Sequence, residues 1–294
     1  MIDKWFVVQH KRIFVGMKRI LAPFLIIFLL ACSTMDSQKQ ETLSSGATNS
    51  TAAPQQMDTI PVLLQQLLAA YPAQQFRATA THLIWQDGEA MLFDDGKVKD
   101  FGALLQYPDL QDQLALAYTP TQIPLDTPLH NQDPGRIRVE AFFRKMYGDN
   151  PTAVAANLKT IEFFGQKVRV TTINGVHEKL ERISKKLLEQ EAKWSKYLQN
   201  IGGTFHWRNI AGTNRLSMHS FGMTLDINVR YADYWRWQAR GQALDEHFRI
   251  AYRNKIPLEI VQIFEAEGFI WGGKWYHYDT MHFEYRPELL SKSL

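Results

Sequence analysis

The stretch SMHSFGMTLDIN, residues 217–228, decides the fold of this chain. Its second half alternates polar and apolar residues, which is the pattern of a β-strand with one face against the core. Thr224 and Asp226 fall on one face of that strand, and the leucine and isoleucine beside them fall on the other. Gly222 permits a sharp turn just before the strand. We expect this turn to bring the imidazole of His219 beside the carboxylate of Asp226.

A second polar cluster on an apolar background follows later in the chain, in YHYDTMHFE, residues 276–284. There His282 offers a third nitrogen or oxygen ligand to a metal ion. Three such protein ligands, with a fourth position left to water, are the arrangement of a catalytic zinc site. The chain has one cysteine, Cys32, which excludes a thiolate-rich metal site. The two stretches therefore predict a zinc site built from histidine and carboxylate ligands.

Zinc-dependent hydrolysis also requires a base. The ion lowers the pKa of its bound water and polarises the carbonyl under attack. A carboxylate beside that water must then take its proton and pass it to the leaving amine. Asp279, three residues before His282, is placed for that role. Glu284, two residues after His282, shares a strand face with it and is the rival candidate.

Together the two stretches resemble a known enzyme family. Ser-x-His-x-x-Gly-x-x-x-Asp, followed by Asp-x-x-His-Phe, is similar to the motifs of the D-alanyl-D-alanine carboxypeptidase and dipeptidase family. That family includes the vancomycin-resistance peptidases and the phage L-alanyl-D-glutamate endolysins. The resemblance extends through residues 203–208 and 268–275, and it covers roughly the last hundred residues, the size of a small domain. It implies a zinc metallopeptidase that hydrolyses peptide bonds in peptidoglycan stem peptides.

The resemblance also implies roles for individual residues. The family's Zn²⁺ ligands correspond to His219, Asp226 and His282. Asp279 corresponds to its general acid and base, and Ser217 to a motif serine that supports the metal site from behind the ligands. The family uses an arginine upstream of the first motif to bind substrate and stabilise the oxyanion. Arg208 and Arg215 both qualify for that role, with Arg208 slightly favoured by its spacing.

Several residues near the motifs have a less specific pattern. Thr224 stands where the family usually has alanine, a small change that we expect to leave the site undisturbed. His277 is expected either to assist substrate binding or to hold a structural hydrogen bond. The run Trp271-Gly272-Gly273-Lys274-Trp275 is expected to form one wall of the active-site cleft, because it lies so close to Asp279, and a tight loop packed by its tryptophans is the alternative. The aromatic residues between positions 231 and 237 are interpreted as core packing, with stacking on the sugar rings of the glycan as the alternative.

The predicted fold class is α+β, with a small antiparallel sheet that carries the metal site on its strands and helices packed against it. By resemblance this is the DD-peptidase and hedgehog-like fold. Upstream the sequence predicts a helix over 62–70, a hairpin around Asp87-Gly88, an ordered loop over 110–134, a strand over 168–173 and a helix over 176–198. Residues 57–201 are the expected N-terminal part of the folded region, and residues 202–294 the expected catalytic core.

The N-terminus resembles a bacterial lipoprotein signal. A basic start at Met17-Lys18-Arg19 precedes a short apolar run that ends in a lipobox before Cys32. Residues 1–32 are therefore the expected signal region, with Met17 as a candidate true start, and a signal anchor or secretory signal as the alternatives. By resemblance, a lipidated Cys32 attaches the protein to the membrane, at the outer membrane facing the periplasm in a diderm host. Residues 33–56 are the expected disordered tether.

Charge adds little to the choice of function. The chain has 33 basic and 30 acidic residues, a net charge of +3, which gives no reason to expect a nucleic-acid partner. The expected activity is D-alanyl-D-alanine carboxypeptidase-like, and an L-alanyl-D-glutamate type endopeptidase is the first alternative. A non-catalytic zinc- or wall-binding envelope lipoprotein is the second. A glycosidase with two carboxylates would leave His219 and His282 without a task.

Overall fold

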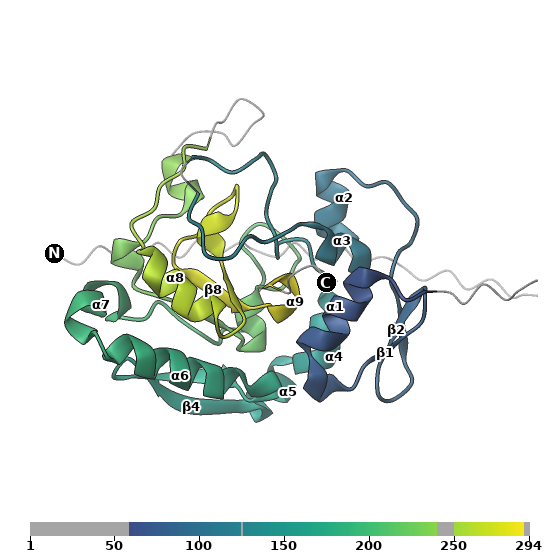
Figure 1. Cartoon of the computed structure of the whole chain (residues 1–294), viewed down its shortest axis with the longest axis horizontal. Coiled ribbons are helices and arrows are strands. Elements are labelled where there is room, and N and C mark those ends of the chain that lie inside the picture. The colour runs from purple at the N-terminus through teal and green to yellow at the C-terminus, as the bar shows by residue number, and fades with distance from the viewer. Residues whose placement is uncertain (1–58, 125, 240–249, 291–294) are drawn as a thin grey trace, which may run out of the picture. The chain divides into compact units, whose positions relative to one another are not determined.

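The strand β8 (His282–Tyr285), labelled in Figure 1, is the middle strand of the sheet that carries both motifs. It lies between β6 (Thr224–Asp226) and β7 (Phe269–Trp271), and both neighbours run antiparallel to it. The computed structural model describes residues 59–124, 126–239 and 250–290, all within one folded unit. The helix α8 (Leu258–Glu265) covers this sheet. The sheet is therefore paired on both sides of β8 and buried by a helix.

Two further antiparallel sheets complete the β structure of the described residues. One has the order β1-β2-β3, and the other pairs β4 with β5. Their strands are β1 (Arg77–Ala78), β2 (His82–Ile84), β3 (Ala90–Leu92), β4 (Leu158–Phe163) and β5 (Gln166–Thr171). The other α-helices are α1 (Val62–Ala70), α2 (Phe101–Gln106), α3 (Leu110–Ala115), α4 (Glu140–Tyr147), α5 (Pro151–Ala156), α6 (Val176–Leu188), α7 (Glu191–Leu198) and α9 (Pro287–Leu290). The predicted α+β class is confirmed.

The upstream predictions agree with the structure in part. The helix over 62–70 and the hairpin around Asp87-Gly88 are present as predicted. The ordered loop over 110–134 is wrong at its start, because Asp109 begins helix α3 with a capping box. In that box the Asp109 side chain accepts from the backbone N–H of Asp112, and the Asp112 side chain accepts in return. These bonds give partners to two backbone N–H groups at the start of the helix, which have no acceptor within the helix itself.

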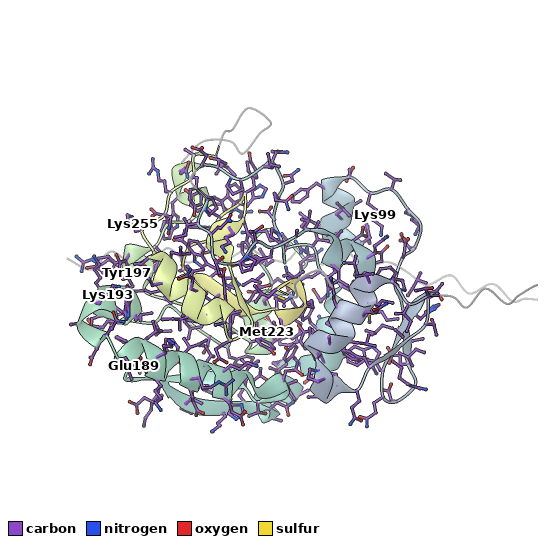
Figure 2. The ribbon with its side chains drawn as sticks, in the orientation of Figure 1. Lys99, Glu189, Lys193, Tyr197, Met223 and Lys255 are labelled. Atoms are coloured by element: carbon purple, nitrogen blue, oxygen red, sulfur yellow. The ribbon has the colours of Figure 1, made fainter. Side chains whose placement is uncertain are left out.

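The single helix predicted over 176–198 is in fact two helices, α6 and α7. The backbone leaves helical geometry at Gln190, with φ −132° and ψ 46°. The apolar spacing continues across this break, and both Leu187 and Trp194 are buried. The exposed side chains in Figure 2 include those of Glu189 and Lys193, on either side of this break, and that of Lys255 later in the chain. Met223 lies among the interior side chains. The periodicity therefore predicted the buried face correctly and missed the turn.

The predictions for residues 1–56, including lipidation at Cys32, lie outside the described residues. Within the described ranges, no helix combines the length and the apolar character needed to cross a bilayer.

One hydrophobic core joins the upstream segment to the motif-bearing sheet. Leu67 of α1 and Phe142 of α4 belong to the same buried cluster as Leu225 of β6 and Phe283 of β8. The ring of Phe264, on α8, stacks on Phe283 with centroids 3.9 Å apart. Burial of apolar side chains is the main stabilising contribution to folding. Both parts of the unit are therefore stabilised by the same core.

A buried ion pair attaches the connection between α3 and α4 to the sheet. Lys274 Nζ lies 2.5 Å from Glu265 Oε1 and donates to the Thr119 carbonyl at 2.6 Å. The same carboxylate accepts from the Tyr118 hydroxyl at 2.6 Å and from the backbone N–H of Thr121 at 2.7 Å. A buried charge pair needs such additional hydrogen bonds to offset desolvation. This arrangement fixes the start of the segment that later supplies Arg136.

Candidate metal centre

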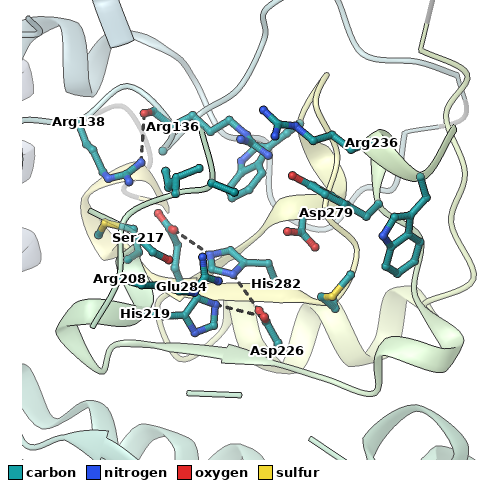
Figure 3. Close-up of a pocket in the computed structure, with 18 residues that line it drawn as sticks. Arg136, Arg138, Arg208, Ser217, His219, Asp226, Arg236, Asp279, His282 and Glu284 are labelled. Carbon is teal, nitrogen blue, oxygen red and sulfur yellow. Dashed lines mark hydrogen bonds and ion pairs between the residues drawn. The ribbon is translucent and has the colours of Figure 1, made fainter. Parts of the chain in front are cut away.

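Strand pairing and one tight turn bring the three predicted ligands together. In the β6–β8 register, Asp226 lies opposite His282, and His282 Nδ1 is 2.9 Å from Asp226 Oδ1. His219 lies in the 3₁₀ helix η3 (Met218–Phe221), and its Nε2 is 3.2 Å from Asp226 Oδ2. One ligand atom from each residue lies within 4.8 Å of the others (Figure 3).

Gly222 makes the turn between His219 and β6 possible. Its φ is +66°, a value that favours glycine. A Cβ at this position would lie 2.6 Å from Leu158 Cδ2, on the neighbouring strand β4. The expected turn at Gly222, which brings His219 beside Asp226, is therefore what the structure contains.

The outer nitrogen of each histidine is held by an acceptor. His219 Nδ1 lies 2.6 Å from the Thr204 carbonyl and 2.8 Å from Thr224 Oγ1. His282 Nε2 lies 3.0 Å from Glu284 Oε2. A carbonyl and a carboxylate only accept, so these two outer nitrogens carry hydrogen. His219 Nε2 and His282 Nδ1 then present lone pairs toward the aspartate, the orientation that metal-binding histidines adopt.

Two lone pairs facing a carboxylate require positive charge between them. A proton on His282 is one source of that charge. Burial alone lowers the pKa of His282, but its hydrogen bonds with Asp226 and Glu284 raise that pKa to about 10. Burial likewise raises the pKa of Asp226, yet the charges and hydrogen bonds of His219 and His282 hold it well below its usual range. A divalent cation supplies the same positive charge, and this donor set fits zinc.

Asp279 lies beside the three candidate ligands with a free oxygen. Its Oδ1 is buried and has no hydrogen-bond partner among the described residues. Burial and the charge of Asp226 raise the pKa of Asp279 to about 6. Its backbone N–H donates to the Gly272 carbonyl at 2.9 Å, and its own carbonyl accepts from the N–H of His282. Asp279 is thus fixed by its backbone while its carboxylate remains available.

Glu284, the rival base, has no free oxygen. Its Oε2 contacts His282, and its Oε1 accepts from Arg286 Nη1 at 3.0 Å. Burial alone raises the pKa of Glu284, but the hydrogen bond to His282 and the charge of Arg286 lower it to about 2. Of the two carboxylates that line the pocket beside the ligands, Asp279 therefore has the geometry of a base.

The site opens into a pocket of about 340 Å³ (Figure 3). Its walls include the three candidate ligands, Asp279, Glu284 and the buried Ser217. Four arginines also line it, namely Arg136, Arg138, Arg208 and Arg236. Tyr234, Trp237 and Trp275 supply aromatic surface. For Tyr234 and Trp237 the core-packing interpretation is incomplete, because both reach the pocket.

The guanidinium of Arg136 is held in one orientation within this pocket. Its Nη2 donates to the His277 carbonyl at 2.7 Å, and its central carbon lies 4.6 Å from the Trp275 ring centroid. Its Nε is buried and has no hydrogen-bond partner among the described residues. Arg138 and Arg215 both donate to the Arg136 carbonyl. An oriented cation with an unused donor therefore points to an anionic or carbonyl ligand.

The structure separates the two arginines considered from the sequence. Arg208 lines the pocket and is exposed. Arg215 does not line it, because its guanidinium is turned to the Arg136 carbonyl. Spacing in the sequence could not identify Arg136, because it lies far upstream of the first motif. The available signal for Arg136 was local. Two arginines, Arg136 and Arg138, flank an isoleucine directly after the turn sequence Asp133-Pro134-Gly135, and that isoleucine is buried.

The structure distinguishes between alternatives at two other places. The run 271–275 contributes to the pocket wall through Trp275. The side chain of Trp271 is fully buried instead, and its Nε1 donates to the Thr280 carbonyl at 2.9 Å. His277 takes the structural alternative, since its Nδ1 lies 2.6 Å from Asp133 Oδ2 and its backbone N–H donates to Asp133 Oδ1. The Thr224 hydroxyl, by its contact with His219, is part of the site.

A family model described as D-alanyl-D-alanine carboxypeptidase matches residues 211–285 of this chain. No curated protein and no solved structure shows significant similarity to it. The matched segment contains His219, Asp226, Asp279 and His282 and ends before Arg286, and the match supports a peptidase related to peptidoglycan.

Proposed function

We propose that this protein is a zinc-dependent peptidase that hydrolyses peptide bonds in peptidoglycan stem peptides, with a carboxypeptidase action. The observation that carries the proposal is the free carboxylate of Asp279 in the same pocket as the histidine and aspartate ligand set. His219, Asp226 and His282 would hold the ion. When bound there, zinc would lower the pKa of a water molecule and polarise a carbonyl oxygen.

The remaining steps belong to side chains of this chain. Asp279 accepts the proton of the attacking water at its free oxygen and donates it to the leaving amine. Its raised pKa of about 6 suits both roles near neutral pH. Arg136 binds a substrate carboxylate or the carbonyl oxygen, because its guanidinium is fixed and has an unused donor. The positive pocket wall favours a substrate with a free terminal carboxylate over an internal peptide bond.

Digestion of purified peptidoglycan tests this function. The protein lacking residues 1–56 is incubated with the polymer, with and without a zinc chelator, and the products are identified by mass spectrometry. Loss of terminal D-alanine that stops with chelator supports the carboxypeptidase. A cut inside the stem peptide would instead assign an L-alanyl-D-glutamate type endopeptidase. A zinc-loaded protein that cleaves nothing would identify a wall-binding or zinc-binding lipoprotein.

Arg136→Gln is expected to lower kcat/KM on a free pentapeptide about 10- to 100-fold, since a hydrogen bond to a charged group contributes about 1.5–3 kcal/mol. The same peptide with an amidated C-terminus separates the two possible contacts. Arg77→Gln, on an exposed arginine outside the pocket, is the control.

A loss confined to the free-acid peptide assigns Arg136 to the terminal carboxylate. An equal loss on both peptides assigns it to the carbonyl oxygen that develops charge. Unchanged kcat/KM on both would remove Arg136 from substrate binding.

We also propose that lipid on Cys32 attaches the protein to the outer membrane, facing the periplasm. The support is the lipobox-like sequence before Cys32, because two or more acyl chains give stable anchoring. Cys32→Ala is expected to move the protein from the membrane fraction to the soluble or unprocessed fraction. Equal membrane retention of the variant after cell fractionation would contradict the lipid anchor.

A further inference from the structure

Arg286 is a buried arginine to which the proposed zinc chemistry gives no role. Its side chain is 0% exposed, and it lies just beyond the segment that matches the family model. Its Nε donates to Glu288 Oε1 at 2.5 Å, and its Nη1 donates to Glu284 Oε1 and to the Gly135 carbonyl, each at 3.0 Å. Burying a guanidinium is costly without such partners, and these leave Nη2 as its one nitrogen without a hydrogen bond to the described residues.

These hydrogen bonds continue on both sides of Arg286. Toward the metal centre, the other oxygen of Glu284 lies 3.0 Å from His282 Nε2. Away from it, the second oxygen of Glu288 accepts from the Tyr71 hydroxyl at 2.6 Å. Tyr71 ends helix α1, which lies beside α9 (Figure 1). A buried row of hydrogen bonds thus runs from a candidate metal ligand to the first helix of the folded unit.

The role of Arg286 follows from the two oxygens of Glu284. The carboxylate of Glu284, two residues after His282 on the same strand, can rotate about the last bond of its side chain. Either of its oxygens can then face His282. Arg286 holds Oε1, and this leaves Oε2 directed at His282 Nε2. A carboxylate fixed in this way keeps hydrogen on Nε2 and the lone pair of Nδ1 toward the ligand site. The phenyl ring of Phe143, 4.9 Å from the guanidinium carbon, limits movement of Arg286.

We propose that Arg286 is a positioning residue for His282 that acts through Glu284. The inference rests on the proposed zinc site. Arg286 would then be a residue that influences zinc affinity from outside the family-matched segment. Arg286 is expected to contact neither substrate nor metal.

Zinc affinity of the full-length chain tests this inference, by competition with a chromogenic chelator. Arg286→Met and Glu284→Gln are each expected to raise the zinc Kd about 10- to 100-fold, the usual cost of losing a group that supports a metal-bound histidine. The double variant is expected to match Glu284→Gln alone, because Arg286 acts through that carboxylate. A merely structural arginine would give additive effects instead.

Lys274→Met is the matched control. It also removes a buried cation from an ion pair, that with Glu265, but its side chain does not line the pocket. It is expected to lower the urea midpoint of unfolding and leave the zinc Kd unchanged.

If Arg286→Met does not fold, Arg286→Lys replaces it. The single ammonium of lysine cannot replace the two guanidinium nitrogens that contact Glu284 and Glu288. A raised zinc Kd is therefore again expected. Wild-type zinc affinity in either folded variant, or additivity in the double variant, overturns the inference. A wild-type protein that binds no zinc overturns the proposed function itself.

Discussion

Asp279→Asn is expected to lower kcat about 100- to 10,000-fold while zinc stays bound, because a positioned general base contributes that much to a rate. Asparagine keeps the shape of aspartate but cannot take a proton from water near neutral pH. Asp279 lies outside the ligand set of His219, Asp226 and His282, so the metal content should be unchanged. D-alanine release and metal analysis of the purified variant measure the two effects separately.

The pH profile gives this prediction a second readout. Asp279 must be ionised to act as a base, and burial with the charge of Asp226 raises its pKa to about 6. The wild-type rate is therefore expected to fall as the pH drops through this region. A bound cation would move that fall to lower pH, since it favours the carboxylate form. The residual rate of Asp279→Asn should lack this dependence.

Asp233→Asn is the control for Asp279→Asn. Asp233 is a partly buried aspartate close in the fold, paired with Lys255 at 3.0 Å, and it does not line the pocket. Its replacement should change the rate little. Near-normal turnover by Asp279→Asn would exclude Asp279 as the base and leave Glu284 as the carboxylate to examine.

His219→Ala is expected to weaken zinc binding more than about 100-fold and to abolish hydrolysis. Loss of a group that only supports a ligand already costs about 10- to 100-fold in metal affinity, and a ligand itself contributes more. Zinc is also expected to raise the Tm of the wild-type protein, because it binds the folded state. That increase should disappear in the variant. Metal analysis and thermal unfolding with and without zinc provide the measurements.

His206→Ala is the matched control for His219→Ala. His206 is exposed, and its side chain does not line the pocket, although its backbone N–H donates to the His219 carbonyl. It should bind zinc as the wild type does. Stoichiometric zinc in His219→Ala would contradict the proposed ligand set.

The local sequence was sufficient for the elements that carry the ligands. Alternation around Asp226 and the glycine at 222 predicted a strand preceded by a turn, because side-chain period and backbone freedom are local properties. The same reasoning failed at Gln190, where the apolar period continues through a turn. It also missed α3, although Asp109 and Asp112 form a capping box that is visible in the sequence.

The pocket wall could not be predicted in the same way. Arg136 reaches the site from the connection between α3 and α4, which is held in place by Tyr118, Glu265 and Lys274. Contacts between residues this far apart in the chain depend on the tertiary fold. The choice of Arg208 and Arg215 from spacing therefore considered only the arginines near the motif. For a similar reason the sequence could not show which tryptophan of the run 271–275 reaches the pocket, since proximity to Asp279 in sequence does not give the direction of a side chain.

The shared hydrophobic core limits how this enzyme can be divided or recombined. Leu225 and Phe283 bury their side chains in the same cluster as Leu67 and Phe142. A gene fragment that encodes only the family-matched segment would leave that apolar surface in contact with water and would favour aggregation. Domain shuffling during evolution, or grafting of the two motifs onto another scaffold, would have to transfer the upstream helices with them.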